Sequence, residues 1–251
     1  MAVYSRCRRE PLRTRLSSEI PDYSSARGCR LYLYSFARRR ERPLVGTHIS
    51  DGSEFLPVTW RGSAAFVRLY QSRPPAQAVV PHIELVSNPG GRSSEIPGGT
   101  PGISDLGPSE PAGPGPVGLA LRGRKLAFVW IVDTPTCGNQ PPSVVGSALA
   151  EVWADDIDHP GPRLMDRYCS YDSSDLDTGP TFIDANRLAF VAYRDGGPTR
   201  LIYVSTTSAR RQSRSLGQAS VQSIASDTRR LYLQELRGSR ARAHVVSRPI
   251  G

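Results

Sequence analysis

Three aspartates that lie close together in the sequence are the first candidates for chemistry. Asp172, Asp175 and Asp177 share a polar segment, and the run Asp175-x-Asp177-x-Gly179 matches the start of a calcium-binding loop. The later ligands and the glutamate at the twelfth position are absent, so a solvated turn is the simpler interpretation. The sequence therefore predicts no metal site, and nothing else in it calls for a cofactor.

The other residue types that carry catalysis are scattered. The histidines His48, His82, His159 and His244 lie far apart in the sequence, and each is expected in a loop or at the surface. The chain has no Gly-x-Ser-x-Gly motif, which would present a serine nucleophile, and no Walker phosphate loop. We therefore predict no catalytic residue.

Four cysteines, Cys7, Cys29, Cys137 and Cys169, are spaced too widely for a zinc site built on close pairs. Their number fits two disulfides, Cys7–Cys29 and Cys137–Cys169, and four unpaired thiols remain the alternative. Disulfides would indicate an extracytoplasmic location. Met1 to Glu10 carries basic residues, but Pro11 to Arg15 follows where the apolar stretch of a secretion signal would be. A missing N-terminal portion would reconcile the two observations.

Composition indicates an all-β protein with a basic surface. Glycine (23) and proline (22) are frequent, as in β proteins with many turns, and no apolar run approaches the ~18 residues of a membrane-spanning helix. The net charge is +9, and Lys125 is the single lysine among 32 basic residues. This bias is typical of a GC-rich genome. The arginines cluster in 1–50 and 200–251, but because many of them flank turns we expect a solvated surface, and the sequence gives no strong signal for nucleic-acid binding.

The elements that must position these residues are recurring strands. Nearly the same aromatic and aliphatic segment occurs at 63–70, 125–130, 187–195 and 230–234, with a truncated copy at 2–5. From Phe66 to Phe128 is 62 residues, from Phe128 to Phe190 is again 62, and from Phe190 to Tyr232 is 42. Repeats of ~40–50 residues made of four short strands are typical of propeller blades. The segments are apolar at odd and even positions alike, as expected when neighbouring blades cover both faces.

We therefore predict an all-β fold, a β-propeller of four-stranded antiparallel blades in a single domain. The five blades are expected at about 1–48, 49–97, 114–168, 179–217 and 219–251. The first lacks its first strand and the last lacks its fourth. Either the ring closes with about five blades, or the chain belongs to a larger propeller of six to eight blades that is cut short at its N-terminus. A strand that begins almost at Met1 favours the second possibility.

The repeats resemble those of TolB-like β-propellers, which are relatives of the Trp-Asp-repeat propellers. That family carries Ser-Pro-Asp-Gly-Arg-Arg-Leu-Ala-Phe across the first turn and second strand of a blade. Similar residues occur here at 225–232, 183–190 and 121–128, and the resemblance spans most of the chain. No blade has the Gly-His and Trp-Asp pair of the Trp-Asp-repeat family, so the polar network of that family is not expected.

The resemblance implies a ligand face at one end of the channel, where the connections between successive blades converge. These are the loops 47–53, 98–115 and 170–179. The ligand-face candidates are His48, Asp51, Asp105, Asp172, Asp175 and Asp177.

We predict a non-catalytic scaffold that binds a protein or a small ligand at these loops. One alternative is a glycosidase-like propeller hydrolase, which would need paired carboxylates ~5–10 Å apart at the channel mouth. The other is a truncated product of a larger propeller protein.

Overall fold

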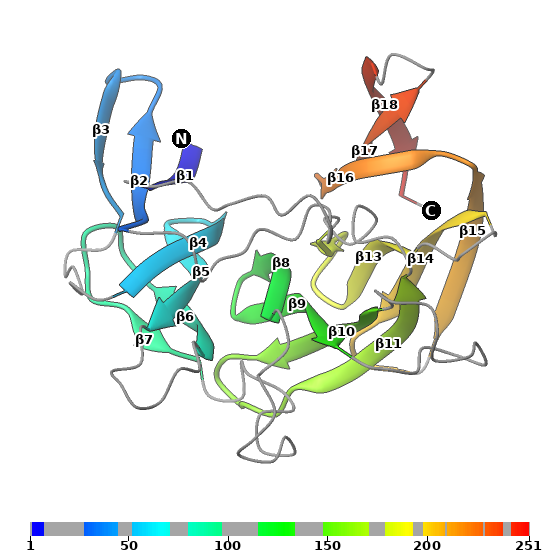
Figure 1. Ribbon diagram of the computed structural model, residues 1–251, viewed down its shortest axis with the longest axis horizontal. Helices are drawn as coiled ribbons and strands as arrows, with labels where there is room; N and C mark the ends of the chain where they lie inside the picture. The colour runs from blue at the N-terminus through cyan, green and yellow to red at the C-terminus, as the bar shows by residue number, and fades with distance from the viewer. Residues whose placement is uncertain are drawn as a thin grey trace.

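The protein is a stack of five antiparallel β-sheets (Figure 1). The computed structural model describes residues 2–7, 28–44, 52–70, 80–96, 115–133, 148–170, 179–192, 198–208, 210–227, 229–237 and 242–250. Within these ranges every helix or strand is a β-strand. The all-β propeller expected from the sequence is confirmed, with three strands in the first and last sheets and four in each of the others.

The strands follow one another in chain order from the inner to the outer edge of each sheet. Sheet 1 contains β1 (Ala2–Arg6), β2 (Arg30–Ser35) and β3 (Arg40–Pro43); sheet 2 contains β4 (Gly52–Trp60), β5 (Ser63–Tyr70), β6 (Val80–Val86) and β7 (Ser94–Glu95). Sheet 3 contains β8 (Gly115–Arg122), β9 (Lys125–Asp133), β10 (Ala148–Asp156) and β11 (Arg163–Ser170). Sheet 4 contains β12 (Thr181–Phe182), β13 (Arg187–Ala192), β14 (Thr199–Ser205) and β15 (Arg211–Gly217), and sheet 5 contains β16 (Ser220–Ser226), β17 (Arg230–Arg237) and β18 (Arg242–Pro249).

Consecutive sheets pack face to face, so the five sheets form an arc in which sheets 1 and 5 are the two ends (Figure 1). The inner strands make most of these contacts: β4 packs on β1 and β8, and β12 packs on β8 and β16. Extensive contacts between the described strands link only consecutive sheets, so none of comparable extent joins sheet 1 to sheet 5.

The recurring strands alternate their side chains between two neighbouring sheets. Phe66, Phe128 and Phe190 are fully buried, as the sequence predicts. Each phenylalanine belongs to the cluster shared with the preceding sheet, whereas the alanine and valine on either side of it belong to the cluster shared with the next sheet. A large ring on one sheet therefore fits against small side chains on its neighbour, which gives dense packing.

The fifth copy is shifted by one residue from the predicted spacing. Leu231 and Leu233 are fully buried in the cluster shared with sheet 4, so Leu233 occupies the position of Phe190. Tyr232 points to the other face, where its hydroxyl donates to Asp227. The resemblance of 225–232 to the TolB-like motif already aligns Leu231 with the motif leucine, and Tyr232 with its alanine.

Short turns in sheets 2 to 5 gather at one end of the arc. The Arg122 guanidinium lies over the Trp60 ring at 4.9 Å and donates to the Phe182 carbonyl. The Ser226 hydroxyl donates to the same carbonyl at 2.5 Å. We call this end the turn face, and its members are 61–62, 123–124, 183–186 and 227–229.

The opposite strand ends are joined by most of the longer segments, and also by the two-residue link 218–219 between β15 and β16. Because strands alternate in direction, each connection from one sheet to the next, each connection from a second to a third strand in sheets 2 to 5, and the connection from β1 to β2 start and end away from the turn face. We call these strand ends the connection face. They flank residues 45–51, 71–79, 97–114, 134–147 and 171–178.

Replacing Gly118 with alanine should destabilise the protein, because β8 passes very close to the segment before β12. A Cβ atom on Gly118 would overlap the Gly179 Cα atom and lie 3.0 Å from the Gly179 amide nitrogen. Neither backbone atom can move freely, so we expect a loss of about 1–3 kcal/mol in the free energy of unfolding, measured in urea. Gly161→Ala is the control, because its Cβ would meet nothing within 4 Å. Equal unfolding midpoints for the two variants would contradict this packing.

Candidate functional site

The predicted ligand-face residues belong to segments that begin and end at the connection face. His48, Asp51, Asp105, Asp172, Asp175 and Asp177 all lie outside the described residues, so their roles stay predictions. The described residues that flank them are the ends of β3 and β4, of β7 and β8, and of β11 and β12.

One predicted disulfide is confirmed, and it lies beside these strand ends. Cys7 follows β1, Cys29 precedes β2, and their sulfur atoms are bonded. Cys137 lies outside the described residues, and the side chain of Cys169 is not described, so the pairing of these two stays a prediction. A disulfide is consistent with an oxidising compartment.

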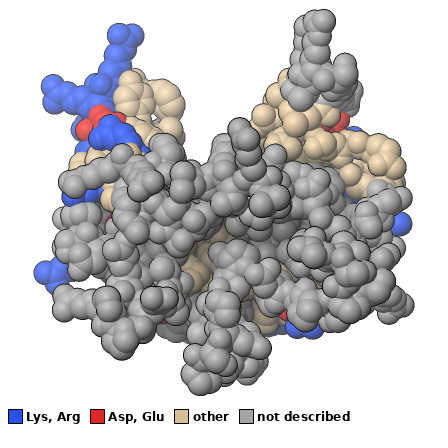
Figure 2. All heavy atoms as spheres, viewed as in Figure 1, with Lys and Arg blue, Asp and Glu red and all other residues tan. Residues whose placement is uncertain are grey.

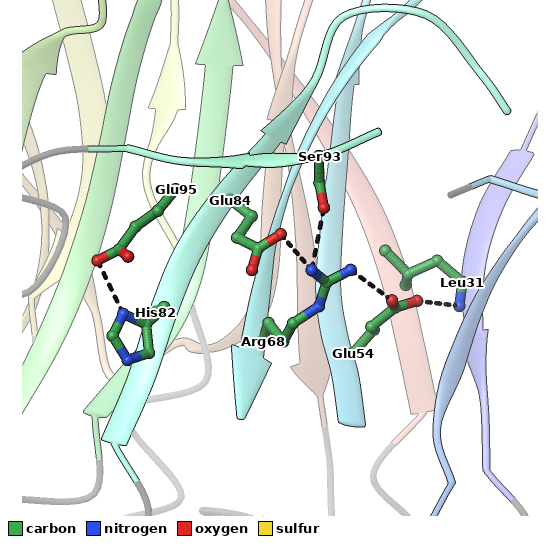
Figure 3. A network of polar contacts seen from close by, with 7 residues as sticks. All are labelled: Leu31, Glu54, Arg68, His82, Glu84, Ser93 and Glu95. Atoms are coloured by element: carbon green, nitrogen blue, oxygen red, sulfur yellow. Dashed lines mark hydrogen bonds and ion pairs between the residues drawn. The ribbon is translucent and has the colours of Figure 1, made fainter. Parts of the chain in front are cut away.

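The most extensive polar site in the described residues is a buried ion network centred on Arg68 of β5 (Figure 3). Its guanidinium pairs through Nη2 with Glu54 of β4 at 2.7 Å, and through Nη1 with Glu84 of β6 at 2.5 Å. Nη1 also donates to the Ser93 hydroxyl at 3.0 Å, and the guanidinium carbon lies 5.2 Å from the centre of the Phe66 ring. Three neighbouring strands of sheet 2 thus bring two carboxylates to one cation.

Glu54 extends the network to sheet 1. Its second carboxylate oxygen accepts the Leu31 amide hydrogen at 3.1 Å. The Glu54 backbone amide donates to the Cys29 carbonyl at 3.1 Å, and its carbonyl accepts the Ser5 hydroxyl at 2.6 Å. One residue therefore joins sheet 2 to both strands next to the disulfide, at the connection face.

Burial decides what this network can do. Only 3% of the Arg68 side chain, 7% of Glu54 and 3% of Glu84 is exposed, and both carboxylates are engaged by the same guanidinium. A pair of carboxylates that worked on a glycosidic bond would have to reach a substrate from both sides. The network instead holds sheets 1 and 2 together near the start of β4.

Sequence reasoning missed these three residues although a signal was present. Arg68 interrupts an otherwise apolar recurring segment, and Glu84 lies in the middle of the aliphatic strand 82–86. Charges in strands with two covered faces must be paired, because an isolated buried charge costs several kcal/mol. The positive charge at position 68 therefore predicted a buried carboxylate nearby, and the negative charge at position 84 predicted a buried cation.

Other titratable groups form smaller sites. The exposed carboxylate of Glu95 lies 2.8 Å from Nδ1 of His82, and Glu151 accepts from the Trp153 indole at 3.1 Å. Among the described residues, no group of three or more His, Cys, Asp and Glu is arranged to hold a metal ion.

Asp155, at the end of β10, is a buried carboxyl with an unusual environment. One oxygen accepts the backbone amides of Gly161 and Asp156, each at 2.9 Å. The other is buried and has no hydrogen-bond donor among the described residues. Burial raises the pKa of Asp155 above 3.8, against the effect of the two backbone hydrogen bonds.

Comparisons with known proteins find only remote structural likenesses. No protein-family model matches the chain, and no curated protein sequence matches it. A chain in the crystal structure of a nidogen/laminin complex is similar over 82% of this chain and 82% of its own length, with 14% identity and a TM-score of 0.32. A prolyl endopeptidase is similar over 89% of this chain and 39% of its own, with 12% identity and a TM-score of 0.38.

A third similar structure is the D477G ACO/RPE65 chimera, which matches over 92% of this chain and 54% of its own, with 11% identity and a TM-score of 0.38. Likenesses this remote say nothing about activity, and membership of the TolB-like family stays a prediction. A search of the described residues finds no helix of the length and apolarity needed to span a membrane.

Replacing Arg68 with methionine should destabilise the protein by about 3–5 kcal/mol, because two buried carboxylates would lose their shared cation. The measurement is urea unfolding, with Arg200→Met, on the exposed side of β14, as the control. Adding Glu84→Gln to Arg68→Met should recover part of the loss, since one buried charge is then removed. A loss below 1 kcal/mol would contradict a buried network.

Replacing Asp155 with asparagine should change how stability depends on pH. The pKa of Asp155 is raised in the folded protein. Its contribution to the free energy of unfolding is therefore most favourable at pH values below its ordinary pKa of 3.8, and this contribution is lost as the pH rises through the folded-state pKa. We therefore expect Asp155→Asn to gain stability relative to the natural protein as pH rises from about 4 to 7. Asp155→Ala should be less stable than the natural protein at every pH, because the Gly161 and Asp156 amides lose their hydrogen-bond acceptor. A pH-independent difference for Asp155→Asn would contradict the shift.

Proposed function

We propose that the chain is a non-catalytic propeller scaffold that binds a protein or a small ligand at its connection face. The observation that carries this proposal is the asymmetry between the two ends of the arc. Turns of two to four residues between first and second strands pack on one another at the turn face, whereas most of the long segments, such as 97–114 with eighteen residues, join strand ends at the connection face. Binding residues occur preferentially on long connections held by a rigid scaffold.

The scaffold beneath this face is firmly tied. The Arg68 network, the contacts of Glu54 to sheet 1 and the Cys7–Cys29 disulfide meet at Ser53 and Glu54, at the start of β4, and the connection 45–51 precedes this strand in the sequence. A rigid base lowers the entropy that a binding loop loses when it takes up a ligand. His48 and Asp51 belong to this connection, which makes them the first residues to test.

The repeats are proposed to be TolB-like, on the residue pattern at 121–128, 183–190 and 225–232. Secretion or a periplasmic location is proposed with them, because the Cys7–Cys29 disulfide would persist in an oxidising compartment.

Replacing Asp51 and Asp177 together with alanine should weaken ligand binding by roughly tenfold or more, since each removes a charged hydrogen-bonding group from the connection face. The probe is a set of peptides selected from a random phage library on the immobilised full chain, with affinity measured by interferometry. The matched control is Asp158→Ala with Asp184→Ala, which removes two exposed carboxylates from short turns. If the peptides lose affinity only for the control variant, and not for the Asp51 and Asp177 variant, the proposal is overturned.

The hydrolase alternative is tested on the same protein with a panel of aryl glycosides. We expect no hydrolysis above the buffer rate. Turnover by the natural chain that disappears in the Asp51 and Asp177 variant would identify catalytic carboxylates and would replace the scaffold by an enzyme.

A further inference from the structure

The hairpin of β2 and β3 carries the densest group of positive charge in the described residues. Arg38 and Arg39 form its tip, and Arg40 and Arg42 lie on β3. Every residue from 36 to 43 is exposed. Figure 2 shows the lysine and arginine atoms gathered on the projection at the upper left, where Figure 1 places this hairpin.

The described residues around these four arginines do not neutralise their positive charge. Glu41 is the nearest acidic residue in the sequence, and it pairs with Arg6 at 3.0 Å and accepts the Tyr4 hydroxyl. Among the described residues, no carboxylate forms an ion pair with any of the four. Such a group repels itself, so an anionic ligand would stabilise it.

The arginines also surround a hollow. It has a volume of about 430 Å³ and is lined by Leu33, Ser35, Arg38, Arg40, Glu41 and Arg42. In the register of the hairpin, Leu33 is opposite Arg42 and Ser35 is opposite Arg40, so both arginines lie on one face. Alternate residues of a strand are about 7 Å apart, which is close to the spacing of successive phosphates in an extended single strand.

Aromatic side chains accompany this charge. Phe36 is 64% exposed, an unusual exposure for a phenylalanine, and its ring meets Tyr34 edge to face at 5.3 Å. Tyr4 stacks on Tyr32 on this aromatic face, and the Arg6 guanidinium lies 4.1 Å from the centre of the Tyr32 ring. In the register of the hairpin this face is opposite the one that carries Arg40 and Arg42, and the two faces meet at the tip, where Phe36 is close in sequence to Arg38 and Arg39. An exposed ring at a tip that carries arginines offers stacking to a base and charge neutralisation to its phosphate.

We propose that the β2–β3 hairpin binds single-stranded nucleic acid, with Arg38, Arg39, Arg40 and Arg42 on the phosphates and Phe36 stacked on a base. The sequence already places these five residues within 36–42, and the fold adds that all of them are exposed on one hairpin. Sulfated polysaccharides and acidic peptides could use the arginines, but neither has a base to stack on Phe36. The hairpin tip is at the opposite end of sheet 1 from Cys29, so this site is separate from the connection face.

The test is fluorescence anisotropy of a labelled oligothymidylate with the full chain at several salt concentrations. If four phosphates are neutralised, the logarithm of the association constant should fall with the logarithm of salt concentration with a slope of about −3. Arg40→Ala with Arg42→Ala should reduce the size of this slope by about 1.4. Phe36→Ala should weaken binding about tenfold without changing the slope, because it removes stacking and no charge.

The control variant is Arg210→Ala with Arg214→Ala, which removes two exposed arginines from sheet 4 and should leave binding unchanged. Phe36, Arg40 and Arg42 are all exposed, so their replacement should leave the melting temperature unchanged. The proposal is overturned if the natural chain does not bind at low salt, or if the control weakens binding as much as the hairpin variant. It is also overturned if Phe36→Ala has no effect while heparin binding depends on the same arginines, which would indicate a sulfated polysaccharide.

Discussion

The structure depends on the requirement that the recurring strands of sheets 2, 3 and 4 be covered on both faces. An isolated sheet with Phe128 on one face and Val129 on the other would expose apolar surface on both sides. Stacking removes that surface from water, at about 25 cal/mol for each Å². The fit is specific as well as apolar, since Phe128 and Phe190 each enter a cluster that contains the alanine and valine of the preceding sheet. A larger residue in place of either alanine would meet the neighbouring ring directly.

The same requirement makes sheets 1 and 5 special, because among the described strands each has an extensive partner on one face only. Sheet 5 satisfies its outer face with polar contacts: Tyr232 donates to Asp227, and Arg230 donates to the Ser247 hydroxyl at 2.5 Å. Hydrogen bonds from the Arg229 amide, Tyr232 and the Arg230 amide lower the pKa of Asp227. Sheet 1 instead presents stacked tyrosines beneath Arg6. A polar outer face is what a terminal repeat needs for solubility, whereas an aromatic and cationic face is suited to contact with a ligand.

Sequence periodicity predicts the repeated part of this protein, because burial of both faces requires apolar residues at odd and even positions in every copy. The positions of Phe66, Phe128 and Phe190 were predictable in this way, whereas the Cys7–Cys29 pairing was predicted from the number and spacing of the cysteines. The predicted position of the fifth copy was wrong by one residue. Tyr232 is aromatic, but Leu233 occupies the buried position that is equivalent to Phe190. The Arg68 network involves side chains from separate strands, and their proximity follows from register and stacking. The residues of the hairpin site are adjacent in the sequence, but their common exposure follows from the fold. The segments that carry His48, Asp51 and the three aspartates have no periodicity, so no pattern fixes where their side chains lie.

The buried ions explain how sheet 1 can be attached firmly through a small area. Sheet 1 has three strands, and its apolar contribution to the shared cluster is essentially Leu31, Leu33 and Leu44. Its remaining attachment is polar and lies next to Glu54, whose carboxylate and backbone together engage Leu31, Cys29 and Ser5. Hydrogen bonds to a charged group contribute more than neutral ones, and they have a direction that apolar contact lacks. We infer that Glu54 fixes the orientation of sheet 1 on sheet 2. Arg68 and Glu84 hold Glu54 in place, so the charged network, rather than a larger core, determines where the disulfide and the basic hairpin lie.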